Sequence, residues 1–146
     1  MPLFNDNITY LASSFAHHFA RLLTSSFQQQ GIPVTAEQFA ILMLLSNQNG
    51  IPQQDISLQL ERDKTTITRV LINLKKQALI RQEGNKNDTR AKYVYLTAKG
   101  KKMQSRALQV AASIYSHILN GISANEIKQG VKLLQQMNAA IKNLQP

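Results

Sequence analysis

The chain has 146 residues, of which 43% are hydrophobic, and a formal net charge of +9, so it is long enough for one domain with a buried core. It has no cysteine, which excludes disulfides, thiol redox sensing and thiolate metal ligands. It contains no run of 18 apolar residues and no signal-peptide pattern at the N-terminus, so we expect a cytoplasmic protein without a membrane span.

The first predicted helix covers Asn5 to Gln30, where apolar residues recur at intervals of three and four. Asp6 or Asn7 can cap its start, and Gly31 ends it. Its stripe consists of Ile8, Leu11, Ala12, Phe15, Phe19, Leu22, Leu23 and Phe27. A terminal helix of this kind has more apolar surface than one neighbour can cover, so a partner subunit is the natural cover.

The second predicted helix begins at Thr35, where T-A-E-Q forms a capping box with Gln38. Its nearly continuous apolar run predicts a buried, central helix. Two shorter helices follow, Ile51 to Leu60 and Asp63 to Ile80, joined by L-E-R-D. Together these two helices predict a helix-turn-helix.

The helix predicted over Asp63 to Ile80 has two different faces when residues are placed about 100° apart. The inner face carries Ile67, Val70, Leu71 and Leu74. The outer face carries Thr65, Arg69, Ile72, Asn73 and Lys76, flanked by Thr66 and Thr68. Arginine can read guanine, asparagine can read adenine, and a methyl-bearing side chain can contact thymine. On this stretch alone, a solvated helix face is an equally good interpretation.

A β-hairpin is predicted after this helix. Residues Glu83 to Arg90 are rich in turn formers, and Ala91 to Thr97 alternate with β-formers. A helix-turn-helix followed by a two-stranded hairpin is a winged helix.

The positive charge is concentrated on the predicted winged helix. The segment from Glu61 to Lys102 has 12 basic and 4 acidic residues, whereas the rest of the chain has a net charge of +1. Such a concentration is what neutralisation of phosphates requires. An acidic membrane surface is the main alternative partner, but no strongly amphipathic basic helix occurs.

Two further helices complete the chain. Thr97 caps the fifth, which runs to about Asn120, and Ser123 opens the sixth with the capping box S-A-N-E. The sequence therefore predicts a mainly α fold with a small β-hairpin wing, in which a winged helix-turn-helix is flanked by N- and C-terminal dimerisation helices.

The runs D-K-T-T-I-T-R, D-T-R-A-K and Y-L-T-A-K-G resemble those of the MarR family of bacterial transcription regulators, and the resemblance covers nearly the whole chain. It implies a single domain, with dimerisation helices at 1–31 and 121–146, a DNA-binding winged helix at 35–97 and a connecting helix at 98–120. It also implies a homodimer on a pseudo-palindromic operator, with recognition helices about one DNA turn apart.

The resemblance also indicates which residues contact DNA. The predicted set is Gln53, Gln54, Thr65, Thr66, Thr68, Arg69, Asn73, Lys76, Asp88, Arg90 and Lys92. At the tip of the wing, Asp88 is expected to orient Arg90 into the minor groove. The family usually has glycine where this chain has Ala78, and serine or threonine where it has Ile51. A left-handed cap at Ala78 would cost roughly 1 kcal/mol or more, so this helix could instead end in a different conformation.

Other functions are less well supported by the sequence. No catalytic motif or glycine-rich phosphate loop occurs, so we expect no enzyme and no cofactor. His17, His18 and His117 are the only histidines, and exposed helix histidines are preferred over a metal site. The resemblance implies a small anionic aromatic effector, for which Tyr10, His17, Arg21 and Met43 are weak candidates. The alternative function is a winged-helix module for protein interaction, which would have a more apolar surface.

Overall fold

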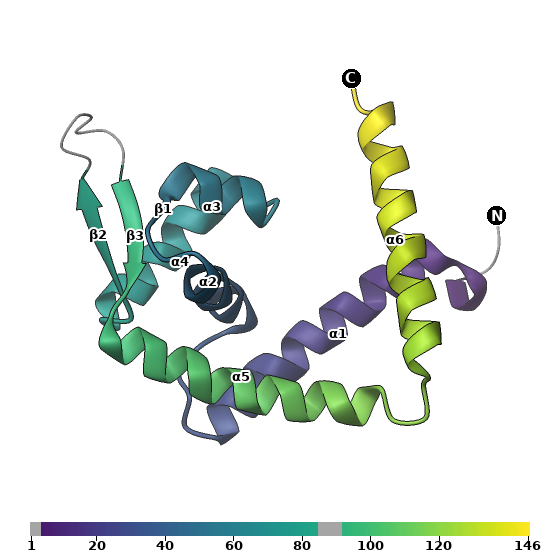
Figure 1. Ribbon diagram of the computed structural model, residues 1–146, viewed down its shortest axis with the longest axis horizontal. Coiled ribbons are helices and arrows are strands. Elements are labelled where there is room, and N and C mark those ends of the chain that lie inside the picture. Colours follow the sequence, from purple (N-terminus) through teal and green to yellow (C-terminus); the bar gives the residue numbers. More distant parts are fainter. Residues whose placement is uncertain (1–3, 85–91) are drawn as a thin grey trace. The chain divides into compact units, whose positions relative to one another are not determined.

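The computed structural model describes residues 4–84 and 92–146 (Figure 1). The chain divides into two compact units, residues 1–111 and 112–146. The first unit holds η1 (Phe4–Asp6), α1 (Ile8–Gln29), α2 (Ala36–Asn47), β1 (Ile51–Pro52), α3 (Gln53–Gln59), α4 (Lys64–Lys76), β2 (Ile80–Gly84) and β3 (Lys92–Leu96). Helix α5 (Ala98–Ile118) begins in the first unit and ends in the second, which also holds α6 (Ala124–Leu144).

The predicted helix caps are confirmed. Asn7 caps α1, and its side chain accepts hydrogen bonds from the backbone N–H groups of Thr9 and Tyr10. Thr35 and Gln38 form the capping box of α2, and Ser123 forms the corresponding box of α6. These side chains satisfy backbone N–H groups that have no partner within the helix.

Helix α2 is central to the first unit, as predicted, because its Ile41, Leu42 and Leu45 are almost fully buried. It packs against α1, α4 and β3. The predicted inner face of α4 is also confirmed, since Ile67, Val70, Leu71 and Leu74 are all buried. Ile56 and Ser57 of α3 are buried as well, which allows the close crossing of α3 and α4.

Helix α4 ends at Lys76, four residues earlier than the sequence predicted. It ends in the left-handed conformation, with φ of 58° at Ala78, despite the absence of glycine. The N–H of Leu79 donates to the carbonyl of Leu74, and the N–H of Ala78 donates to that of Lys75, each at 3.0 Å. This is a Schellman motif, and the fully buried Leu74 and Leu79 supply its apolar contact.

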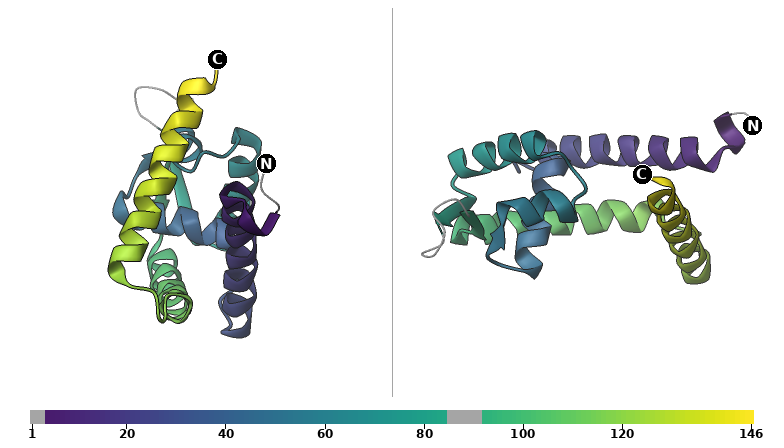
Figure 2. Two further views of the ribbon diagram at one scale, coloured as in Figure 1. Left: turned by 90° about the vertical axis from the view of Figure 1, so that its right-hand side faces the viewer. Right: turned by 90° about the horizontal axis from the view of Figure 1, so that it is seen from above.

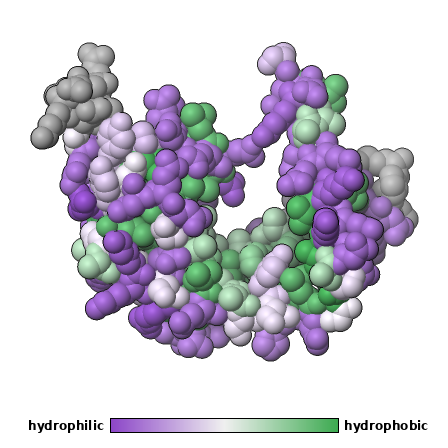
Figure 3. Space-filling view, in the orientation of Figure 1, coloured by the Kyte–Doolittle hydropathy of each residue, from purple (hydrophilic) through white to green (hydrophobic). Residues whose placement is uncertain are grey.

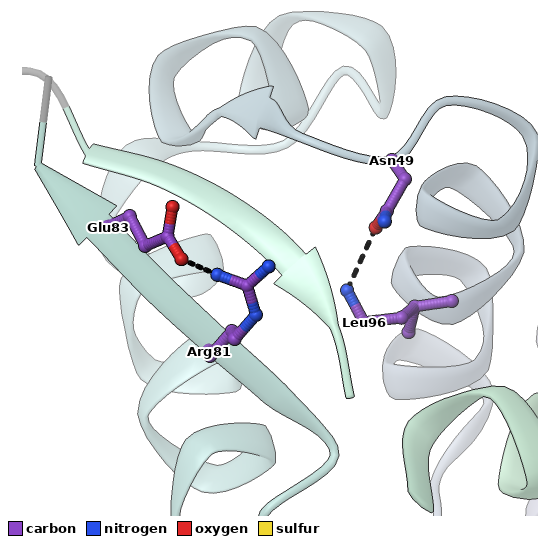
Figure 4. Close-up of polar contacts among 4 residues, drawn as sticks. All are labelled: Asn49, Arg81, Glu83 and Leu96. Atoms are coloured by element: carbon purple, nitrogen blue, oxygen red, sulfur yellow. Dashed lines mark hydrogen bonds and ion pairs between the residues drawn. The ribbon is translucent and has the colours of Figure 1, made fainter. Parts of the chain in front are cut away.

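The sheet has one strand more than predicted. Strands β2 and β3 form the expected antiparallel hairpin, from the pair Ile80 and Leu96 to the pair Gly84 and Lys92. In addition, β1 pairs with the other edge of β3, and the strand order is β1-β3-β2. The Asn49 side chain extends this pairing, because its Oδ1 accepts a hydrogen bond from the N–H of Leu96 at 3.0 Å (Figure 4).

The start of α5 is packed closely against the end of α4. A Cβ atom at Gly100 would collide with the carbonyl oxygen of Leu79. Thr97 caps α5 by accepting from the N–H of Gly100 at 2.9 Å, and its hydroxyl donates to the carbonyl of Ala78 at 2.6 Å. The hairpin, the end of α4 and the start of α5 therefore meet at one fixed junction.

Both ends of the chain leave apolar side chains exposed. Within the first unit, α1 extends beyond the winged helix (Figure 2), and its Leu11 and Phe15 are 46% and 52% exposed. In α6 no residue is buried, and Val131, Leu134 and Ile141 are exposed. Figure 3 shows hydrophobic side chains, in green, at the surface among hydrophilic ones. The stripes predicted from the sequence are therefore largely uncovered in the single chain.

The strained end of α4 yields a test of stability. Replacing Ala78 with glycine should stabilise the protein by roughly 1 kcal/mol, because glycine adopts the left-handed conformation without steric cost. Gly31, with φ of 70° after α1, is the matched control, and Gly31→Ala should destabilise by a similar amount. Urea unfolding of both variants measures these changes, and destabilisation by Ala78→Gly would contradict the assigned strain.

Candidate nucleic-acid interface

The outer face of α4 forms a shallow, cationic surface without an acidic residue. It is lined by Lys64, Thr65, Thr68, Arg69, Ile72, Asn73 and Lys76. Five of the residues predicted to contact DNA thus share this surface: Thr65, Thr68, Arg69, Asn73 and Lys76. Ile72 is 49% exposed among them and offers a methyl group beside the cations and the amide.

Thr66, in contrast, does not lie on this surface. Its side chain is half-buried and lines a cavity of about 220 Å³ between α1, α2 and α4. The helical repeat explains the difference, because Thr66 lies one turn before the buried Val70 and is on the same side of α4, where both line this cavity. The DNA contact at Thr66 stays a prediction, and in the structure its backbone N–H helps to cap α4.

The N-terminus of α4 is fixed by Asp63. Its Oδ1 accepts from the N–H of Thr66 at 2.5 Å. The backbone and side-chain hydrogen bonds from Thr66 lower the pKa of the Asp63 carboxyl group, and the nearby Arg69 and Arg62 lower it further. The carboxylate is therefore charged at neutral pH, where it also interacts favourably with the helix dipole.

The C-terminus of α4 is fixed by a polar network that the sequence did not reveal. The amide of Gln77 donates to the carbonyl of Pro33 at 2.6 Å and accepts from the buried Gln38 at 3.0 Å. The Lys99 ammonium donates to the Gln77 carbonyl at 2.9 Å. The sequence predicted Gln38 only as part of a capping box and assigned no role to Gln77. Their pairing could not be predicted because the two residues are 39 positions apart.

The two glutamines of α3 that were predicted to contact DNA, Gln53 and Gln54, differ in exposure. Gln53 and Gln54 both line a cavity of about 190 Å³ between α3 and α4, together with Thr68. Gln54 is exposed, whereas Gln53 is half-buried and bonded at both ends of its amide. Its Nε2 donates to the Thr68 hydroxyl at 3.2 Å, and its Oε1 accepts from the Gln82 amide at 3.1 Å. Gln82, on β2, had no signal in the sequence.

On the wing, two of the described charged residues, Arg81 and Glu83, pair with each other, and Lys92 lies at the start of β3. Arg81 forms an ion pair with Glu83 (Figure 4). Its guanidinium also lies over the Tyr95 ring, at 4.4 Å from the ring centroid. Lys92 is exposed at the start of β3. The predicted contacts of Asp88 and Arg90 lie outside the described residues.

The weak effector candidates do not all line one pocket. His17 and Arg21 line an open pocket of about 410 Å³ with Thr35 and Glu37. Neither Tyr10 nor Met43 lines this pocket: Tyr10 packs on Phe4, and Met43 accepts from Gln104 at 3.0 Å. Tyr10 shares a face of α1 with His17 and Arg21 but lies two to three helical turns away from them, and Met43 lies on α2 outside the pocket. A common effector site for all four residues stays a prediction. The pocket of His17 adjoins the apolar cavity beside Thr66, since both are lined by Ala20, Ala36 and Glu37.

The described part of the chain contains no cluster of three or more histidine, aspartate or glutamate side chains placed to hold a metal ion. No described helix is long and apolar enough to cross a membrane.

Three comparisons with known proteins agree on the family. The model of the MarR family matches residues 34–92, which span α2, the helix-turn-helix and the hairpin. The transcriptional regulator HosA of Escherichia coli O157:H7 is 28% identical over 137 residues, covering 94% of this chain and 98% of that protein.

Solved structures extend this similarity to the fold. A probable transcriptional regulator from Pseudomonas aeruginosa is 25% identical, with a TM-score of 0.79 and coverage of 91% of this chain and 98% of the other. MepR of S. aureus, solved in complex with DNA, is also 25% identical, with a TM-score of 0.80 and coverage of 92% and 96%. HosA and the Pseudomonas aeruginosa protein are described as transcriptional regulators. With its helix-turn-helix, its wing and these relatives, the chain is similar in sequence and fold to the MarR family of winged helix-turn-helix transcriptional regulators.

Proposed function

We propose that this protein is a homodimeric, ligand-responsive repressor that binds double-stranded DNA with sequence specificity through α4. The acid-free outer face of α4 carries this proposal, because it combines two lysines and an arginine with an amide, hydroxyls and a methyl group. A protein that binds operators must reach the chromosome, so we also propose a cytoplasmic location.

The chemistry of this face matches the major groove. Arg69 can donate to guanine, Asn73 can pair with adenine, and Ile72 can contact the methyl group of thymine. Lys64 and Lys76 lie at the two ends of the surface, where they can contact phosphates. The fixed ends of α4 support this proposal, since a reading helix must hold its register against the bases.

The wing is proposed to add contacts beside the groove. Lys92 is exposed at the start of β3. Asp88 and Arg90 keep the minor-groove role expected from the sequence. Because Arg81 is held by Glu83 and Tyr95, we assign it to stabilisation of the wing.

The terminal helices are proposed to form the dimer. The exposed apolar side chains of α1 and α6 support this, because a water-exposed stripe of this length is costly in a monomer. We therefore propose one MarR-type domain, with dimerisation segments 1–31 and 121–146, a winged helix at 35–97 and a connecting helix at 98–120. A two-fold axis would present two α4 helices to successive major grooves.

A small anionic aromatic molecule is the proposed effector. The apolar cavity beside Thr66 can take an aromatic ring, and the adjoining His17 and Arg21 can bind a carboxylate. Arg21 is the better candidate because its guanidinium is always charged. Since this cavity is lined by Thr66, Ile67 and Val70 of α4, an occupant would contact the DNA-reading helix directly.

DNA reading is tested with Arg69→Ala. Against duplexes selected by the wild type from a random pool, this variant should lose about 1–3 kcal/mol per half-site and relax the preference at particular bases. Arg106→Ala is the matched control, because it removes the same charge from α5, where Arg106 contacts the Gln30 carbonyl at 3.3 Å. Equal losses on every sequence would contradict base reading by Arg69.

The same binding assay should also depend on salt. If the dimer makes six to ten phosphate contacts, its affinity should fall by roughly 10³–10⁵ between 50 and 200 mM salt. A flat response, or absence of any preferred duplex, would instead favour the winged-helix protein-interaction module.

Dimerisation is tested by sedimentation at micromolar concentration. The wild type should sediment at about twice 16.4 kDa. Phe15→Asp should give a folded monomer, because it places a charge on the exposed stripe of α1. Ser13→Asp, on an exposed position of the same helix, should remain dimeric. A wild-type monomer that still binds DNA would overturn the proposed architecture.

The effector site is tested by calorimetry with a panel of benzoate derivatives. At least one should bind the wild type and weaken its complex with DNA. Arg21→Ala should reduce that affinity by about tenfold, because a charge-assisted hydrogen bond is lost. Arg106→Ala should leave the affinity unchanged, and equal weakening by both variants would contradict a carboxylate contact at Arg21.

A further inference from the structure

We propose that Gln82, Gln53 and Thr68 form a directed hydrogen-bond chain through which the wing sets the hydrogen-bonding role of Thr68 toward DNA. This inference rests on the proposed function and makes Gln82 a specificity-determining residue that itself need not contact a base. It also assigns Gln53 a positioning role.

The chain connects three separate elements. Gln82 lies on β2, and its half-buried amide donates to the Oε1 of Gln53, the first residue of α3, at 3.1 Å. The Nε2 of Gln53 donates in turn to the hydroxyl of Thr68 on α4 at 3.2 Å. The residues are 29 and 15 positions apart in sequence, so only the tertiary fold brings them together.

The structure gives the chain its direction by orienting the Gln82 amide with its nitrogen toward Gln53. The nitrogen of a glutamine side chain only donates, and its oxygen only accepts. Because Gln82 presents its nitrogen, Gln53 must present its oxygen to the wing and its nitrogen to α4. The Thr68 hydroxyl therefore accepts from Gln53, and its own proton remains available for another acceptor.

Thr68 is exposed on the outer face of α4, beside Thr65 and Arg69. A hydroxyl that keeps its proton favours acceptors in the groove, namely O6 and N7 of guanine, N7 of adenine and O4 of thymine. If Gln53 were rotated by half a turn, the hydroxyl would donate inward. Only its lone pairs would then face DNA, and these favour the amino groups of adenine and cytosine.

The substitution Gln82→Glu inverts this direction. A carboxylate can only accept, so Gln53 must rotate to present its nitrogen to the wing. At one base pair per half-site, the preference should shift by about fivefold or more, from an acceptor-bearing to a donor-bearing base. The measurement is relative affinity across all single-base variants of a duplex that the wild type selects from a random pool.

Two further variants separate this effect from added charge and from misfolding. Combined with Thr68→Val, Gln82→Glu should weaken binding uniformly and no longer shift any preference, because the hydroxyl is gone. Gln82→Met, which carries neither charge nor amide, should relax the preference at the same base pair as Thr68→Val alone. Melting curves by circular dichroism identify variants that fail to fold. If Gln82→Glu fails to fold, Gln82→Met alone tests the hydrogen-bond chain.

The outcomes are distinct from those that test the proposed function. If the wild type selects no sequence, the proposed function fails. If it selects one, and neither Gln82→Glu nor Gln82→Met alters the preference at the base pair affected by Thr68→Val, only the hydrogen-bond chain is overturned. A shift that persists in the Thr68→Val background also overturns it, because the wing would then act by another route.

Discussion

The structure of the first unit depends on burial of the inner face of α4. Leu71 and Leu74 are at most 2% exposed, and each such side chain contributes roughly 1.5–3 kcal/mol when removed from water. This face packs against α2, α3 and β2, so one helix joins the core, its helical partner and the wing. The same burial fixes the rotation of α4, and the polar face at the opposite side must then point outward.

Rotation alone does not fix the position of a helix along its axis, and here polar contacts at both ends do so. Asp63 holds the N-terminus, while the left-handed Ala78 and the Gln77–Gln38 pair hold the C-terminus. Asp63 and the turn at Ala78 satisfy backbone groups at the helix ends that would otherwise lack partners, and the Gln77 side chain also donates to the Pro33 carbonyl. The strain at Ala78 is tolerated because burial of Leu74 and Leu79 on either side of it stabilises this turn.

Polar contacts connect α4 and its C-terminal turn to several other parts of the first unit. Gln77 contacts the segment between α1 and α2, Thr97 joins the start of α5 to the end of α4, and Gln53 joins β2 to α4. The cavity between α1, α2 and α4 lies among these connections. If the outer face of α4 binds DNA as proposed, an occupant of this cavity or a movement of the wing would change that face without any change in the residues that form it.

The sequence by itself determined the helices, their caps, the inner and outer faces of α4, and the resemblance to the MarR family, because periodicity, capping and short motifs are local properties of the chain. It failed where contacts join distant residues. Tertiary packing decided the third strand β1, the end of α4 at Ala78, the half-buried position of Thr66 and the position of Met43 outside the pocket of Arg21. Tertiary packing also decided the hydrogen bonds of Gln53 with Gln82 and Thr68. The sequence around a glutamine does not indicate which groups its amide will bond, because those groups come close only when the elements that carry them pack together.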